Sequence, residues 1–190
     1  MRIDDILDLI REEPDPDPAW RRVLEICNAD RPSALWSSLP AVDIAADATR
    51  LCAWLEAALQ GVDGPLGLYL GLDTLNMDGG AGTNLEIGWS RRCDTTSDGV
   101  DWVFGELERG SKTLIRGLVP LHAEYAQDRW RDRFSVADYM LFLAYSGLVL
   151  ACAVRQLART DPMLVAWGFH DGDIFALCRC GRGRFEMICS

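Results

Sequence analysis

The sequence has no apolar stretch long enough to cross a membrane. Residues 139–154 form its longest segment without a charged side chain, and Asp138 and Arg155 close this segment at both ends. It is shorter than the roughly 20 residues that a transmembrane helix needs, which favours a buried core helix. Residues 1–18 mix acidic and apolar side chains, a pattern that excludes a signal peptide. We therefore expect a cytoplasmic protein that does not bind membranes.

Histidine is scarce, and neither of the two histidines belongs to a complete motif. His122 and Glu124 match the H-x-E half of the zinc-dependent nucleobase deaminases, whose other half is P-C-x-x-C. That second half is absent, because a single residue separates Cys178 from Cys180 and no proline directly precedes them. The sequence therefore disfavours a deaminase.

Motifs for phosphate binding and nucleophilic catalysis are also incomplete. Residues 78–83 are rich in glycine but lack both G-x-G-x-x-G spacing and the lysine of a P-loop, so a flexible connector between strands is expected. Ser146 lacks the first glycine of a G-x-S-x-G elbow and falls within a predicted helix. We expect a protein without enzymatic activity, cofactor or bound metal.

The seven cysteines are odd in number and lie mostly in apolar segments, which fits a reducing compartment better than a disulfide framework. A two-residue turn at Arg182-Gly183 would place Cys178 opposite Met187. Cys178, Cys180 and Cys189 would then share one apolar face of the sheet. Since structural zinc takes four ligands, we expect this face to belong to the core and not to a zinc site.

Negative charge is in excess and is unevenly distributed. The net charge is −10, and residues 1–86 carry 16 acidic and 6 basic side chains, whereas residues 87–190 carry 13 of each. Such a chain repels nucleic acids and anionic membrane surfaces. The excess is explained either by simple solubility, for which a net charge away from zero is a common device, or by a basic protein partner.

Length and composition predict a single domain. The chain has 190 residues, of which 49% are hydrophobic and 25% charged, so it can form a core without disulfides or metal.

Residues 1–60 are predicted to be helical. The first helix is amphipathic over residues 3–10, and the second has Asp17 as its N-cap and Pro18 in its first position. A third helix begins near residue 41 and ends at Gly61.

Alternating apolar residues predict a pair of strands after the helices. Leucine occupies every second position over residues 66–72, and Gly67 and Gly71 on the other face invite close packing by another element. A second alternating segment over residues 85–89 is expected to pair with the first.

Residues 94–133 are the least regular part of the sequence. Trp102 and Phe104 alternate with smaller or polar positions and suggest a third strand. Leucines between residues 114 and 125 suggest a helix instead, with a break near Pro120.

The C-terminal region predicts a meander of three strands. Apolar strands over residues 163–169 and 174–180 flank a tight turn at Asp171-Gly172, and a further turn leads into a strand over residues 185–189.

A long helix before this meander should form the centre of the fold. Residues 135–158 are apolar on all sides, and Gly147 in their middle indicates a close crossing with another element. We therefore predict an α+β domain, with helices over residues 1–60 and a mainly antiparallel sheet plus the core helix over residues 61–190.

Two groups of residues are candidates for function. Acidic residues in the strand region and tryptophans in polar surroundings could bind a protein partner; they are Asp73, Asp78, Glu86, Trp36 and Trp130. His170, Asp171 and Asp173 bring an imidazole and two carboxylates into one turn and could line a pocket, which defines the alternative of a small-molecule enzyme or binder.

The acidic chain, with Gly-Leu-Tyr-Leu-Gly-Leu-Asp at residues 67–73 and Trp-Gly-Phe-His-Asp-Gly-Asp at residues 167–173, resembles the immunity proteins of bacterial polymorphic-toxin systems in general character. The resemblance implies a non-enzymatic protein that binds and occludes a cognate toxin, often a basic nuclease. It assigns no role to any single residue.

Overall fold

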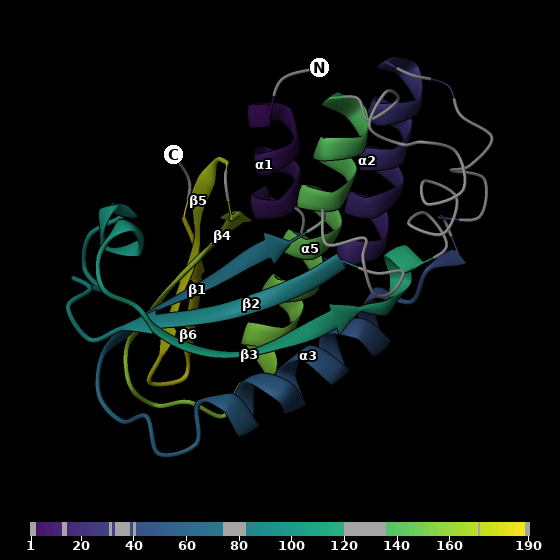
Figure 1. The fold of residues 1–190 in the computed structure, drawn as a ribbon. Coiled ribbons are helices and arrows are strands. Elements are labelled where there is room, and N and C mark those ends of the chain that lie inside the picture. The colour runs from purple at the N-terminus through teal and green to yellow at the C-terminus, as the bar shows by residue number, and fades with distance from the viewer. Residues whose placement is uncertain are drawn as a thin grey trace.

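The computed structural model describes residues 3–12, 15–30, 32, 39, 41–73, 83–119, 136–170 and 172–188. The elements in chain order are α1 (Ile3–Glu12), α2 (Pro16–Asp30), α3 (Ile44–Ala58), β1 (Leu66–Asp73), β2 (Thr83–Ser90), the 3₁₀ helix η2 (Asp101–Phe104), β3 (Glu108–Ile115), the 3₁₀ helix η3 (Arg116–Leu118), α5 (Val136–Gln156), β4 (Met163–Phe169), β5 (Ile174–Gly181) and β6 (Arg184–Met187). They form one six-stranded sheet with the long helices gathered on one of its faces (Figure 1).

The predicted α+β class is confirmed, and the sheet is mixed with one parallel pair. Its strand order is β3-β2-β1-β4-β5-β6. β1 pairs with β2 in antiparallel orientation, as the alternating leucines predicted, and with β4 in parallel orientation. β4, β5 and β6 are successive antiparallel neighbours, which confirms the C-terminal meander.

The N-terminal helices form where the apolar spacing predicted them. In α1, Ile6, Leu7 and Ile10 are buried. α3 begins after Asp43, whose Oδ1 accepts a hydrogen bond of 2.8 Å from the Ala46 amide. α3 ends at Ala58 with Leu59 as its C-cap, so Gly61 lies one residue beyond the C′ position predicted for it. Its φ of +78° is a left-handed conformation that glycine adopts without strain.

The predicted start of α2 is wrong by two residues. The helix begins at Pro16, and the Asp17 amide donates to Asp15 Oδ1 at 3.1 Å, so Asp15 caps the helix. The sequence carries the same Asp-Pro signal twice in succession, at residues 15–16 and 17–18. Proline is favoured in the first position of a helix, and both Pro16 and Pro18 meet this rule, so the local pattern does not distinguish the two possible helix starts.

Helix α5 lies at the centre of the fold. It packs against α1, α2 and α3 and against strands β4 and β5. By length and composition alone it could span a membrane, but 83% of its most apolar window is buried inside the protein. A Cβ on Gly147 would lie 2.9 Å from Trp167 Cζ2, which confirms the predicted close crossing.

The prediction for residues 94–133 is wrong where the structure describes them. Trp102 lies in η2 and not in a strand, and the third strand is β3, which covers residue 114 where a helix was expected. β3 is an edge strand of mostly polar residues that pairs only with β2, so its position depends on that pairing and not on its own periodicity. The predicted break at Pro120 lies outside the described residues.

The first turn of the meander also differs from the prediction. Gly168 pairs with Ile174, whereas a two-residue turn at Asp171-Gly172 would pair it with Phe175. The Gly172 amide donates to the Phe169 carbonyl at 3.2 Å, so a turn closes one residue earlier than expected. Asp171 itself lies outside the described residues.

The second turn of the meander is as predicted. Arg182 and Gly183 have φ angles of +53° and +71°, as a type I′ turn requires. Cys178 pairs with Met187, and Cys180 pairs with Phe185. Cys178 is buried in the main core and Cys180 packs against it. Cys189 lies outside the part of the chain that the structure describes.

Candidate functional site

The carboxyl ends of β1 and β4 are one place where a ligand could bind. These strands are parallel neighbours, but after β1 the chain turns to β2 on one side and after β4 it turns to β5 on the other. Such a switch in direction is where open sheets commonly form a ligand crevice. Asp73 ends β1, and His170 directly follows β4.

Ion pairs occupy the outer face of the sheet at this end, the face opposite the long helices. Lys112 Nζ lies 2.9 Å from Asp73 Oδ2 and 3.5 Å from Glu86 Oε2. Arg109 Nη1 lies 2.8 Å from Glu86 Oε1. The hydrogen bond from Arg109, with smaller contributions from Lys112 and His170, holds the pKa of Glu86 below its usual value. Asp73 and Glu86 are therefore balanced by cations of their own chain.

The structure brings together residues from both groups of candidates. His170, proposed for a pocket, lies over Gly71, where an added Cβ would be 3.3 Å from His170 Nδ1, and Gly71 pairs with Glu86, which was proposed for partner binding. Asp78, Asp171, Trp36 and Trp130 lie outside the described residues.

Asp173 does not join this cluster. Its Oδ2 accepts a hydrogen bond of 3.3 Å from the hydroxyl of Tyr139 in α5. The Tyr139 ring stacks on Phe169 with 4.2 Å between ring centroids, so this contact lies on the helical side of the sheet. Burial, together with the Asp173 charge, raises the pKa of Tyr139 to about 12. His170 and Asp173 thus point to different faces and do not form an acid–base pair.

The cysteines are poor nucleophiles where the structure describes them. Burial raises the pKa of Cys93 and of Cys180 to about 11, and it raises the pKa of Cys178 well above its usual value. These thiols stay protonated at neutral pH, and the thiolate is the reactive form. Within the described ranges, no group of three His, Cys, Asp or Glu side chains is arranged to hold a metal ion.

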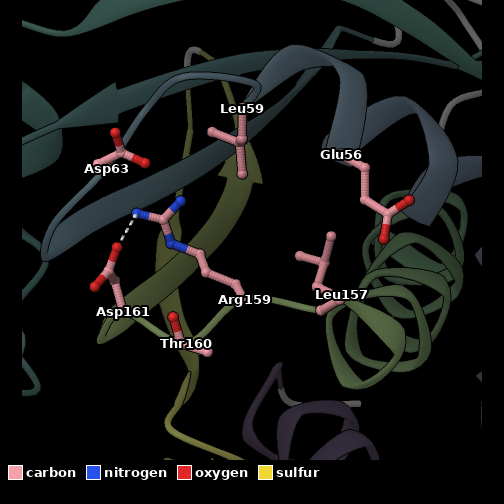
Figure 2. Close-up of a pocket in the computed structure, with 8 residues that line it drawn as sticks. Glu56, Leu59, Asp63, Leu157, Arg159, Thr160 and Asp161 are labelled. Carbon is pink, nitrogen blue, oxygen red and sulfur yellow. Dashed lines mark ion pairs between the residues drawn. The ribbon is translucent and has the colours of Figure 1, made fainter.

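A cavity of about 250 Å³ lies at the opposite, amino ends of β1 and β4 (Figure 2). Its lining consists of Glu56, Leu59, Asp63, Leu157, Ala158, Arg159, Thr160 and Asp161. Its volume is below the roughly 300–1,000 Å³ of typical ligand pockets. His170 and Asp173 are not part of the lining, so the cavity does not provide the pocket that was expected beside the hairpin.

The guanidinium beside the cavity holds the backbone together. Arg159 donates to the Val62 carbonyl at 2.7 Å and to the Gly64 carbonyl at 2.6 Å. Asp161 Oδ2 accepts from the Gly64 amide at 2.8 Å and lies 3.9 Å from Arg159 (Figure 2). These bonds fix the loop before β1 against the loop before β4. Arg159 and Asp161 therefore stabilise the fold at this end of the sheet.

Residues 91–107 connect β2 to β3, and we call them the outer segment. They cover part of the outer face of the sheet over β1 and β4. A Cβ on Gly67 would lie 2.8 Å from the Trp102 ring, which confirms the prediction that another element packs closely against this glycine. Val103 is buried with Tyr69 and Ala166. The segment is therefore anchored on the sheet by apolar contacts.

Hydrogen bonds also hold the outer segment. Arg179 of β5 donates to the carbonyls of Thr95 and Thr96, each at 3.1 Å, and forms an ion pair with Asp98. Asp94 Oδ1 accepts from the Thr96 amide at 2.9 Å and from its hydroxyl at 2.6 Å. The Thr96 hydroxyl is the main reason why the pKa of Asp94 is lowered.

Phe104 at the end of η2 remains 74% exposed on this fixed segment. Sequence reasoning missed it as a surface residue, because alternation with Trp102 suggested a strand. Glu106 was the available signal, since in an alternating strand it would share the apolar face with Trp102 and Phe104.

The chain matches no protein-family model, and no curated protein or solved structure was found to be similar to it.

Proposed function

We propose that the protein binds a basic protein and blocks its action by occlusion, as the immunity proteins that it resembles do with their toxins. The observation that carries this proposal is a row of exposed carboxylates on α1. Asp4, Asp8 and Glu12 are all exposed and are spaced four residues apart, so they lie on one side of the helix.

The base next to this row is turned into the fold. The Arg11 side chain is only 5% exposed: its Nη2 donates to the Ala176 carbonyl of β5 at 3.4 Å, and its Nη1 lies 4.0 Å from Asp8 Oδ1 in an ion pair that leaves the Asp8 side chain 60% exposed. Exposed Asp15 and Asp17 at the start of α2 extend the acidic surface. Part of the negative excess of residues 1–86 therefore lies exposed in this region.

Other acidic residues of the same half of the chain have tasks within the fold. Asp43 caps α3, Asp47 is buried, and Asp73 and Glu86 form ion pairs with strand β3. They contribute little to the field that an approaching partner meets. The α1 row, defined by Asp4, Asp8 and Glu12, replaces them as the surface that would steer a basic partner.

A field of this kind acts on the rate of association. Exposed charges attract an oppositely charged protein over about 10 Å at 0.1 M salt and over longer distances at lower salt. Charge complementarity raises the association rate constant and makes it fall with added salt, whereas dissociation depends more on the desolvated centre of the interface.

The test begins with a pull-down from the native host at low ionic strength. The recovered protein is then purified, and its association with the wild type and with the variant D4K/D8K/E12K is measured over a salt series. We expect the variant to associate about ten-fold more slowly at low salt and to lose most of the salt dependence.

The control is E25K/E56K/E186K, which changes the total charge equally at exposed positions on other elements. A partner that is acidic or small would contradict the proposal, as would equal association rates for the two variants.

A further inference from the structure

We propose that the outer segment anchors the basic partner by inserting Phe104 into an apolar pocket on the partner's surface. This inference rests on the proposed function, since it names the contact through which occlusion would occur. It adds a docking surface that is separate from the steering row on α1.

Phe104 is exposed to an unusual degree for its size. Among the described residues, the large hydrophobic side chains with exposed surface are Phe104 at 74% and Val136 at 59%. A single exposed apolar side chain is common on protein surfaces and needs no explanation by itself. The support for a binding role comes from the residues that surround and hold Phe104.

The neighbours of Phe104 are fixed before any partner arrives. Trp102 fills the space over Gly67, Val103 is buried, and Arg179 ties residues 95–98 to β5. An aromatic side chain has only two rotatable bonds, so holding it in place costs little conformational entropy. A rigid segment that presents such a side chain loses little freedom on binding, which favours affinity.

The charge around Phe104 identifies the kind of partner. The acidic residues of the outer segment and of the first position of β3 are Asp94, Asp98, Asp101, Glu106 and Glu108. The bases of the outer segment are Arg91, which donates to the Asp63 carbonyl, and Arg92, whose Nη1 lies 3.3 Å from Glu106 Oε2 in an exposed ion pair. Arg179 of β5 pairs with Asp98, so the five carboxylates still outnumber these three bases. An aromatic centre within an acidic rim matches an apolar pocket that is bordered by lysine or arginine.

The composition of the surface also matches that of known binding centres. Interfaces place one or a few large aromatic anchors at their centre, and a polar rim around them excludes water. Phe104 would be the anchor, and Asp101 and Glu106 would belong to the rim. The same arrangement disfavours nucleic acid, because the acidic rim repels phosphate.

The test uses a defined probe, a phage-displayed library of random 16-residue peptides. The library is selected in parallel on the wild type, on Phe104→Ala and on Val136→Ala, which removes a comparably exposed apolar side chain from α5. We expect peptides that are rich in lysine or arginine and contain apolar residues to be enriched on the wild type and on Val136→Ala, but not on Phe104→Ala.

Synthetic copies of the enriched peptides are then titrated against the same three proteins. We expect Phe104→Ala to weaken binding at least ten-fold and Val136→Ala to change it less than two-fold. The double variant D101N/E106Q should bind more weakly than the wild type and show a reduced dependence on salt. The thermal midpoints of the variants should match that of the wild type, because the replaced side chains are exposed.

The inference is wrong if no peptide is enriched on the wild type over Phe104→Ala, or if the enriched peptides are acidic. It also fails if the protein recovered from the host binds Phe104→Ala as tightly as it binds the wild type; the proposed function would then stand without this anchor. If Phe104-dependent basic peptides are found but the host partner is acidic or small, the proposed function fails and the docking surface remains.

Discussion

The hydroxyl of Tyr145 in α5 donates a hydrogen bond of 2.9 Å to Asp47 Oδ2 in α3. Asp47 is only 3% exposed, and the same oxygen accepts a bond of 2.8 Å from the Gly117 amide after β3. Arg50, one turn further along α3, forms an ion pair with the other carboxylate oxygen. This buried carboxylate therefore connects the core helix, a flanking helix and the end of the edge strand. Burial and the Asp47 charge raise the pKa of Tyr145.

Removing the Tyr145 hydroxyl should destabilise the protein. Tyr145→Phe leaves Asp47 with one donor fewer in a buried position, and we expect the free energy of unfolding to fall by about 1–3 kcal/mol. The measurement is equilibrium unfolding in urea. Tyr139→Phe is the matched control, because its hydroxyl bonds to exposed Asp173 and should contribute less than about 1 kcal/mol. Equal effects of the two substitutions would contradict the structural role of Asp47.

Gly147→Ala should destabilise the protein although alanine favours helices. In an unobstructed helix this substitution stabilises by about 1 kcal/mol. Here the new Cβ would lie 2.9 Å from Trp167 and 3.1 Å from Ile10 Cδ1, so the core must shift to admit it. We expect a net loss of about 1–3 kcal/mol in urea unfolding. A gain in stability would show that α5 and β4 do not cross this closely.

Gly67→Ala should loosen the outer segment. The new Cβ would lie 2.7 Å from Cys93 Cβ and 2.8 Å from the Trp102 ring. We expect faster proteolytic cleavage within residues 91–107 and a changed tryptophan fluorescence spectrum. Gly99→Ala is the control, since its nearest contact would be the Ser97 hydroxyl at 3.3 Å. Equal cleavage rates for both variants and the wild type would contradict the packing of Trp102.

Burial of Cys93 should make stability depend on pH in the alkaline range. Its pKa is raised from 9.0 in the unfolded chain to about 11 in the folded protein. As pH rises, the thiol of the unfolded chain loses its proton before the thiol of the folded protein does. The stability that the protonated, buried Cys93 contributes is therefore fully present below pH 9 and is lost as pH rises towards 11. We expect the wild type to lose more stability than Cys93→Ala between pH 8 and pH 10.5, measured by urea unfolding under reducing conditions. Parallel pH profiles would show that this thiol is not buried.

The elements that the sequence predicted correctly depend on local patterns. The leucine alternation of β1, the apolar spacing of α1 and the glycine-containing turn at Arg182-Gly183 each act within a few residues. The pairing of Cys178 with Met187 followed from that turn alone, because a turn of two residues determines the register of the strands that it joins.

The candidate surfaces were predicted much less well. Asp73 and Glu86 were expected to face a partner, but both pair with Lys112, which lies on β3, a strand that the sequence did not predict. Phe104 was assigned to a strand and lies exposed at the end of η2. Exposure and ion pairing depend on which distant segments meet, and no local pattern contains that information.

The sequence by itself determined the helical N-terminal region, the buried core helix and the antiparallel meander, because periodicity, caps and turn residues act over short distances. The tertiary structure alone decided that β1 pairs with β4 in parallel, that Asp47 meets Tyr145 and Gly117, and that the outer segment packs over Gly67. These contacts join residues distant in the sequence, and their stability comes from burial and hydrogen bonding that exist only after the chain has collapsed.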